Sequence, residues 1–208
     1  MSAIDQVLAR GPVIPVIVLE RESDAVPLAK ALVAGGLSAL EVTLRTPAAL
    51  GSIQRIAAEV PAAIPGAGTV LRPADVTAAV AAGARFLVSP GVTPALLGAM
   101  DDSGVPALPG AATASEVMAL AERGYTSLKF FPAEPAGGVP YLKALAGPLP
   151  GIRFCPTGGI TAQTAPRYLA LPSVACVGGS WMVPPALVAA GDWPAIERLA
   201  AEAATLTV

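Results

Sequence analysis

The sequence contains no histidine among its 208 residues. A chain without histidine cannot build a Ser-His-Asp or Cys-His nucleophile system, a histidine general base or the usual catalytic zinc site. Any chemistry must therefore use lysine, carboxylates, tyrosine, cysteine or backbone groups. Cysteine is also scarce. Cys155 and Cys176 stand in separate strand-like segments, and we expect both to be reduced, buried thiols of a cytoplasmic protein.

Charge is sparse and balanced, with 13 lysines and arginines against 15 aspartates and glutamates. No basic stripe indicates a nucleic acid or an anionic membrane as a partner. The mean hydropathy is +0.64, yet glycine or proline interrupts the apolar runs before the ~18 residues that a membrane span requires. The amino-terminal stretch also lacks the layout of a secretory signal. We therefore expect a cytoplasmic protein that binds neither nucleic acid nor a membrane.

Eight short apolar runs end in Gly, Pro, Ser or Thr, and Ala/Leu-rich amphipathic stretches separate them. Their spacing predicts one (β/α)8 barrel (TIM barrel) domain over residues 1–208. An additional N-terminal helix, SAIDQVLAR, is expected across the barrel bottom. A doubly wound open sheet is the alternative. The predicted strands begin at Val13, Ala39, Ala63, Phe86, Pro106, Ser127, Arg153 and Val174.

Only three lysines occur, and Lys129 stands in the middle of the apolar run SLKFF. Side chains alternate along a strand, so Lys129 faces the interior if its leucine and phenylalanine neighbours face the helices. Desolvation disfavours the charged ammonium, and a neutral amine can attack a carbonyl carbon to form a Schiff base. An interior ion pair with Glu41 or Glu134 is the alternative. Lys30 and Lys143 fall in helical stretches and are expected to reach water.

The run LEVTLRT places Glu41, Thr43 and Arg45 on one face of the second strand. Glu41 is a candidate proton shuttle beside an iminium, because a buried carboxyl group suits that task. The guanidinium fork of Arg45 fits a substrate carboxylate. A Glu41–Arg45 pair that merely neutralises itself is the alternative.

The segments PTGGI and VGGSW close the seventh and eighth strands. Glycine pairs before a helix expose backbone N–H groups, and barrels frequently hold a phosphate at these two loops. Tight turns without a ligand are the alternative. Thr69, Pro90 and Thr157 also fall at strand ends and are candidate substrate-binding residues, although Thr157 could instead serve as a cap. The candidate phosphate ligands are Gly158, Gly159, Gly178, Gly179 and Ser180.

Six segments occur in the order and approximate spacing of the bacterial 2-keto-3-deoxy-6-phosphogluconate (KDPG) aldolases: EVTLRT, GAGTV, SPG, KFFPAE with GGV, FCPTGGI and GGSW. The chain resembles that family from about Pro12 to its carboxyl-terminal helix. EVTLRT and the surroundings of Lys129 are specific, whereas SPG alone is not. The resemblance implies a homotrimeric class I aldolase, without a metal or other cofactor, that splits KDPG into pyruvate and glyceraldehyde 3-phosphate. Members of the family also act on 4-hydroxy-2-oxoglutarate or on the galactose-configured sugar acid.

The resemblance also implies a role for individual residues. Lys129 would form the Schiff base with the C2 ketone, and Glu41 would move protons through the steps. Phe131 would wall the pyruvyl pocket. The pyruvyl carboxylate end would be held by Arg45, Thr69 and Thr157, and the phosphate by Gly158, Gly159, Gly179 and Ser180.

Pro135 and Pro140 depart from the family pattern and stiffen the loop after the sixth strand. Two other functions stay open at this point. A phosphosugar isomerase or epimerase would keep the phosphate site and use carboxylates as acid and base. A non-enzymatic barrel that binds a phosphorylated sugar acid would keep Arg45 and the glycines without a reactive lysine.

Overall fold

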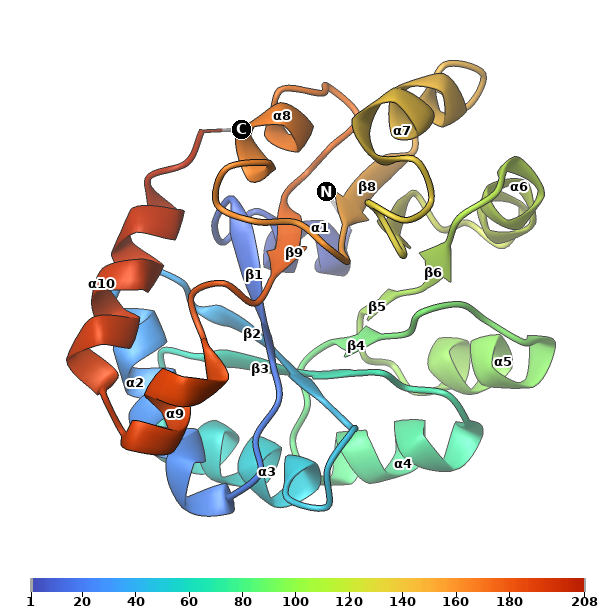
Figure 1. Cartoon of the computed structure of the whole chain (residues 1–208). Helices are drawn as coiled ribbons and strands as arrows, with labels where there is room; N and C mark the ends of the chain where they lie inside the picture. The colour runs from blue at the N-terminus through green and yellow to red at the C-terminus, as the bar shows by residue number, and fades with distance from the viewer. Residues whose placement is uncertain (1, 208) are drawn as a thin grey trace.

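In the computed structural model, which describes residues 2–207, short strands lie at the centre and helices surround them (Figure 1). The strands are β1 (Val13–Ile17), β2 (Ala39–Thr43), β3 (Ile64–Gly68), β4 (Leu87–Val88), β5 (Ala107–Leu108), β6 (Gly110–Ala111), β7 (Ser127–Phe130), β8 (Arg153–Pro156) and β9 (Val177–Gly179). The helices are α1 (Ala3–Leu8), α2 (Ala25–Ala34), α3 (Ala49–Glu59), α4 (Pro73–Ala81), α5 (Pro94–Asp102), α6 (Ala114–Glu122), α7 (Gly138–Ala146), α8 (Ala165–Leu169), α9 (Pro185–Ala190) and α10 (Trp193–Ala204). A 3-10 turn, η1 (Glu22–Asp24), precedes α2.

The strands pair in parallel and form two hydrogen-bonded sheets. One sheet has six strands in the order β5-β4-β3-β2-β1-β9, and the other has three in the order β6-β7-β8. Single parallel bridges, Phe154 to Val174 and Thr157 to Gly178, join β8 to the segment that contains β9. The fold is therefore α/β with a curled parallel sheet, and its helices lie on the outside (Figure 1).

Several strands are shorter than the apolar runs that predict them. The run from Pro106 is divided into β5 and β6 at Pro109, because proline has no N–H with which to continue a ladder. The run from Phe86 contributes only the two residues of β4, and Pro90 follows it closely. The run from Val174 pairs as a ladder only from Val177. Apolar sequence thus marks the path of each strand better than its hydrogen-bonded length.

The predicted N-terminal helix is present as α1. Ser2 caps it, and the Ser2 hydroxyl and the Asp5 carboxylate each accept a bond from the other residue's backbone N–H. The buried side chains of α1 join a small core that contains one residue from each of β1 to β5 and from β8. The members of this core are Ile4, Val7, Leu8, Ile14, Ala39, Ile64, Phe86, Val88, Leu108, Cys155, Ala175 and Cys176. Helix α1 therefore closes the end of the sheet where the strands begin.

A second, larger core lies between the sheet and the surrounding helices, and the strands alternate between the two cores. On β7, Leu128 and Phe130 belong to the larger core, and Lys129 points the other way. On β2, Leu40 and Val42 likewise belong to the larger core. The polar side chains between these residues, Glu41 on β2 and Lys129 on β7, therefore point into the interior of the curled sheet. Among residues 2–207, no helix has the length and apolar character needed to cross a bilayer.

Candidate active site

The centre of the candidate site is an ion pair between two strands that do not neighbour each other in the sheet. Lys129 Nζ on β7 donates to Glu41 Oε1 on β2 across 3.2 Å, and the two side chains are 5% and 4% exposed. The Lys129 Nζ also lies 5.3 Å from the centre of the Phe131 ring. An amine, a carboxylate and an aromatic wall therefore share one interior space. Of the two partners that the sequence leaves open, Glu41 pairs with Lys129.

The end of β3 has the shape that the Glu41 side chain requires. A Cβ at Gly68 would collide with the Glu41 carboxylate, so only glycine leaves room for it. The next residue, Thr69, has φ of 58°, in the left-handed region that side chains other than glycine seldom adopt. Its hydroxyl accepts a 3.2 Å hydrogen bond from Arg45 Nε. Arg45 therefore lies beside Thr69 at the carboxyl ends of β2 and β3, and the alternative Glu41–Arg45 pair does not form.

The first glycine pair follows β8 and lies against the segment that follows Lys129. Gly158 and Gly159 have φ of 108° and 79°, so both depend on glycine's freedom to adopt positive φ. A Cβ at Gly158 would be 3.3 Å from the Phe131 ring. The ring of Phe131 is thus near both the Lys129 amine and this turn.

The second glycine pair belongs to β9 and fits around two larger side chains. The Thr157 side chain occupies the space where a Cβ of Gly178 would be, and Thr157 is buried. Its hydroxyl donates to the Cys155 carbonyl at 3.4 Å and caps no helix. The indole of Trp181 lies in the same way against Gly179, and Ser180 between them is exposed.

Pro90 stands at the end of β4, directly against β6. A Cβ at Gly110 would collide with the Pro90 carbonyl, and Gly110 is the register partner of Lys129. The predicted site residues therefore lie on β2, β3, β4, β7, β8 and β9 or directly after them, with Glu41 in the middle of β2 and the others at or near the carboxyl ends. Barrel enzymes keep their chemistry at this end of the strands.

Two buried thiols lie near Lys129 in the interior, one of them on the neighbouring strand. Cys155 is the register partner of Lys129, and its Sγ lies 3.6 Å from Cys176 Sγ. Both are free and buried, as the sequence predicts. The neighbouring Cys155 thiol and burial raise the pKa of Cys176 well above its usual range. A protonated, buried thiol is a weak nucleophile, so we assign no chemical role to Cys176.

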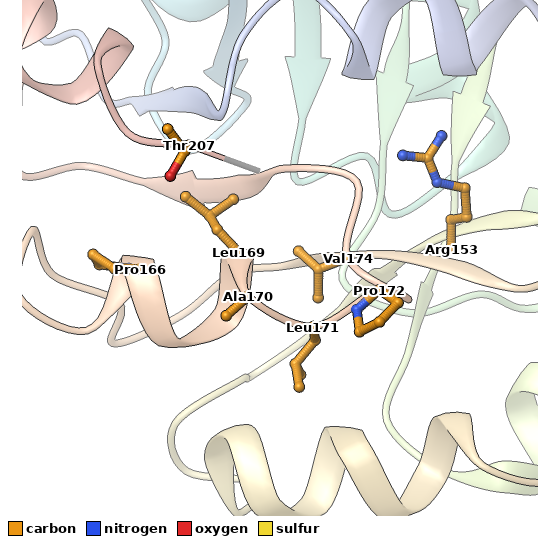
Figure 2. A pocket seen from close by; sticks show the side chains of 8 residues that line it. All are labelled: Arg153, Pro166, Leu169, Ala170, Leu171, Pro172, Val174 and Thr207. Atoms are coloured by element: carbon orange, nitrogen blue, oxygen red, sulfur yellow. The ribbon is translucent and has the colours of Figure 1, made fainter.

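One sizeable cavity lies away from these residues. Its volume is about 500 Å³, and Arg153, Leu169, Leu171 and Val174 are among the residues that line it (Figure 2). Arg153 begins β8, so this cavity is at the amino ends of the strands. None of the predicted site residues lines it. A barrel's chemistry belongs at the other end, and we assign no role to this cavity.

The sequence profile of the KDPG and KHG aldolase family matches residues 4–199. The chain belongs to that family. It is 52% identical to the KHG/KDPG aldolase of Escherichia coli (strain K12) over 202 residues, which are 97% of this chain and 95% of that protein. It is equally 52% identical to the 2-dehydro-3-deoxy-phosphogluconate aldolase of Pseudomonas aeruginosa, covering 97% of this chain and 92% of that one.

Solved aldolase structures share the fold along nearly the whole length. The KDPG aldolase from Legionella pneumophila superposes with a TM-score of 0.95 at 47% identity, covering 99% of each chain, and it holds pyruvate captured at low pH as a covalent carbinolamine intermediate. The Zymomonas mobilis ZM4 enzyme with 3-phosphoglycerate superposes with a TM-score of 0.92 at 50% identity, covering 98% of this chain and 96% of that one.

Three residues around the aldolase site were not singled out by the sequence. Gly68 makes the space for Glu41, Trp181 lies against Gly179, and Tyr168 donates a 2.8 Å hydrogen bond to Glu134. A signal for Trp181 was present, because it is one of two tryptophans and directly follows GGS. Tyr168 gave no such signal, since an aromatic residue in a helix reads as core.

Proposed function

We propose that this chain is a class I aldolase that cleaves KDPG to pyruvate and glyceraldehyde 3-phosphate, and that also cleaves 4-hydroxy-2-oxoglutarate to pyruvate and glyoxylate. The observation that carries the proposal is the buried Lys129 amine, held 3.2 Å from the Glu41 carboxylate inside the curled sheet. A buried amine and a proton acceptor are what Schiff-base formation with a ketone requires.

In the proposed reaction, Lys129 Nζ attacks C2 of the substrate to give a carbinolamine, which loses water to give an iminium. The C4 hydroxyl then loses its proton to a base while the C3–C4 bond breaks. The electron pair of that bond moves into the enamine, and the aldehyde leaves. A proton added to C3 regenerates the iminium, and water releases pyruvate and the free amine. Glu41 is proposed to move the protons, because its carboxylate is the acceptor next to Nζ.

The remaining predicted residues are proposed to bind the two ends of the substrate. Arg45 and Thr69 lie together at the end of β2 and β3 and are proposed, with Thr157, to hold the pyruvyl carboxylate. Phe131 and Pro90 are proposed to line the pyruvyl pocket. The phosphate is proposed to bind the backbone N–H groups of Gly158, Gly159 and Gly179 and the exposed hydroxyl of Ser180.

We further propose that the whole chain, 1–208, is one closed (β/α)8 barrel domain. The β5 and β6 segments are contiguous across Pro109, and the bridges from β8 toward β9 support closure on the other side. Homotrimer assembly is proposed from the family resemblance, and the exposed Leu71 and Met118 provide apolar surface for subunit contacts. A cytoplasmic location suits the two unbonded cysteines.

Trapping with pyruvate and borohydride tests the proposed function. Borohydride reduces an iminium to a stable secondary amine, so the digested protein is expected to carry one reduced pyruvyl group, on the peptide that contains Lys129. Activity should be lost in step with labelling. Lys30 and Lys143 are exposed and serve as internal controls. Labelling of those two alone, or of neither them nor Lys129, would favour an isomerase or a binding protein.

Chelation gives a separate expected result. EDTA should leave the cleavage rate unchanged, because the iminium, not a metal ion, accepts the electrons of the breaking bond. Within residues 2–207, no three His, Cys, Asp or Glu side chains are grouped so as to hold a metal ion. A metal-dependent aldolase assayed in parallel should lose activity. Inhibition of this enzyme that an added divalent ion reverses would contradict the proposed mechanism.

A further inference from the structure

The loop after β7 and the turn after β8 are connected by two backbone hydrogen bonds. Ala133 N–H donates to the Thr157 carbonyl at 2.8 Å, and Glu134 N–H donates to the Gly158 carbonyl at 3.0 Å. The loop that follows the lysine strand therefore continues the sheet pairing beyond the strand ends. The position of this loop therefore sets the orientation of the peptide group between Gly158 and Gly159.

The Glu134 side chain also packs against the second glycine of that turn, Gly159. A Cβ at Gly159 would be 2.8 Å from Glu134 Cβ and 3.1 Å from its Cγ, so the Glu134 stem packs directly on the Gly159 backbone. A shift of Glu134 would let the turn move. The N–H groups of these glycines are those proposed to bind the phosphate, and anion binding by a backbone depends on the direction of the N–H groups.

Tyr168, on helix α8, holds the Glu134 side chain by a hydrogen bond. The Tyr168 side chain is completely buried on α8, and its hydroxyl donates to Glu134 Oε1 at 2.8 Å. Burial and the neighbouring carboxylate raise the pKa of Tyr168 above its usual range, so the phenol remains a hydrogen-bond donor. A buried ring with few rotamers is a rigid anchor, whereas Glu134 alone is exposed and would sample several positions.

We propose that Tyr168 and Glu134 are positioning residues that hold the Gly158–Gly159 turn in its phosphate-binding shape, and so set the preference for phosphorylated over unphosphorylated substrate. This inference rests on the proposed aldolase function. Neither residue needs to touch the reacting carbons. Both act through the turn, because Glu134 contacts it by a backbone hydrogen bond and by packing.

The test compares KDPG with the same sugar acid lacking its phosphate. In Tyr168→Phe, the ratio of kcat/KM for the phosphorylated substrate to that for the unphosphorylated one is expected to fall about five-fold, mostly through KM, as the loss of one such hydrogen bond predicts. Glu134→Ala should give at least as large a fall, because it removes the hydrogen bond and also the Cγ that packs on Gly159. The double variant should fall little further than Glu134→Ala, since the hydrogen bond is already absent there. Glu134→Gln keeps an acceptor oxygen and should recover most of the ratio.

Tyr125→Phe is the matched control. The Tyr125 hydroxyl donates to Asp101 Oδ1 at 2.6 Å, which is the same type of bond, but Tyr125 lies before β7 at the opposite end of that strand. It should lower the melting temperature without changing the substrate ratio. If Tyr168→Phe also lowers the melting temperature and leaves the ratio unchanged, its role is structural only and the inference is wrong.

Two further measurements separate this inference from the proposed function. Pyruvate carries no phosphate, so borohydride trapping at Lys129 should persist in Tyr168→Phe. If borohydride trapped no pyruvate on Lys129 of the wild-type protein, the aldolase function itself would be rejected. Binding of inorganic phosphate, followed by phosphorus NMR, requires no turnover. Its Kd should rise about five-fold in Tyr168→Phe, and an unchanged Kd would overturn the inference.

Discussion

Replacement of Lys129 by methionine is expected to lower kcat/KM for KDPG by on the order of 10⁴-fold or more, because the reaction then loses its nucleophile and its electron sink together. Lys129 is the buried amine of the interior, whereas Lys30 and Lys143 are exposed on α2 and α7. Neither of those can reach the substrate in its place. Steady-state cleavage rates and the loss of the borohydride-trapped pyruvate adduct measure the effect.

A second variant separates chemistry from folding. Lys129→Met leaves the Glu41 carboxylate buried without its partner, which destabilises a fold by about 3–5 kcal/mol. Lys129→Arg keeps a cation next to Glu41, but a guanidinium stays protonated and cannot form a Schiff base. It should be as inactive as the methionine variant while keeping more of the melting temperature. Lys143→Met is the control with normal activity. Substantial cleavage by Lys129→Arg would show that the amine acts only electrostatically.

The orientation of Lys129 was predictable because it follows from local chemistry. Side chains alternate along a strand, and the apolar Leu128 and Phe130 enter the core beneath the helices. The same rule predicts the inward side of β2. The hydrogen-bonded length of the strands was less predictable. Pro109 interrupts one predicted strand, and the ladder of β9 begins only at Val177, because pairing depends on how neighbouring strands approach.

The sequence offered Glu41 and Glu134 as partners of Lys129 but could not decide between them. Glu41 and Lys129 lie 88 positions apart on strands that do not pair, so they meet only through the curvature of the sheet. Glu134 follows the end of β7 and instead accepts from Tyr168. Arg45 bonds to Thr69, whose left-handed backbone turns its hydroxyl toward the β2 end. Partner choice of this kind depends on distances across the fold, which strand periodicity does not encode.

Glu41→Gln is expected to slow turnover by on the order of 10²- to 10⁴-fold, the range typical for loss of a general acid–base group. Glutamine has nearly the same shape, and its amide oxygen can still accept from Lys129 Nζ. The side chain should therefore remain in the space that Gly68 leaves for it. The pyruvate adduct should still form, only more slowly, because the amine is intact. Rapid-quench trapping with borohydride, compared with steady-state rates, separates these two effects.

Gly68→Ala tests the role of Glu41 without replacing Glu41 itself. The added methyl group would collide with the Glu41 carboxylate and displace it from Lys129, although both side chains are kept. If the position of Glu41 limits proton transfer, Gly68→Ala should lower kcat while the peptide trapped by borohydride stays the same. Full turnover in Glu41→Gln would assign the proton transfers to another group or to water. Glu41 would then be only the counter-ion that keeps Lys129 inside the fold.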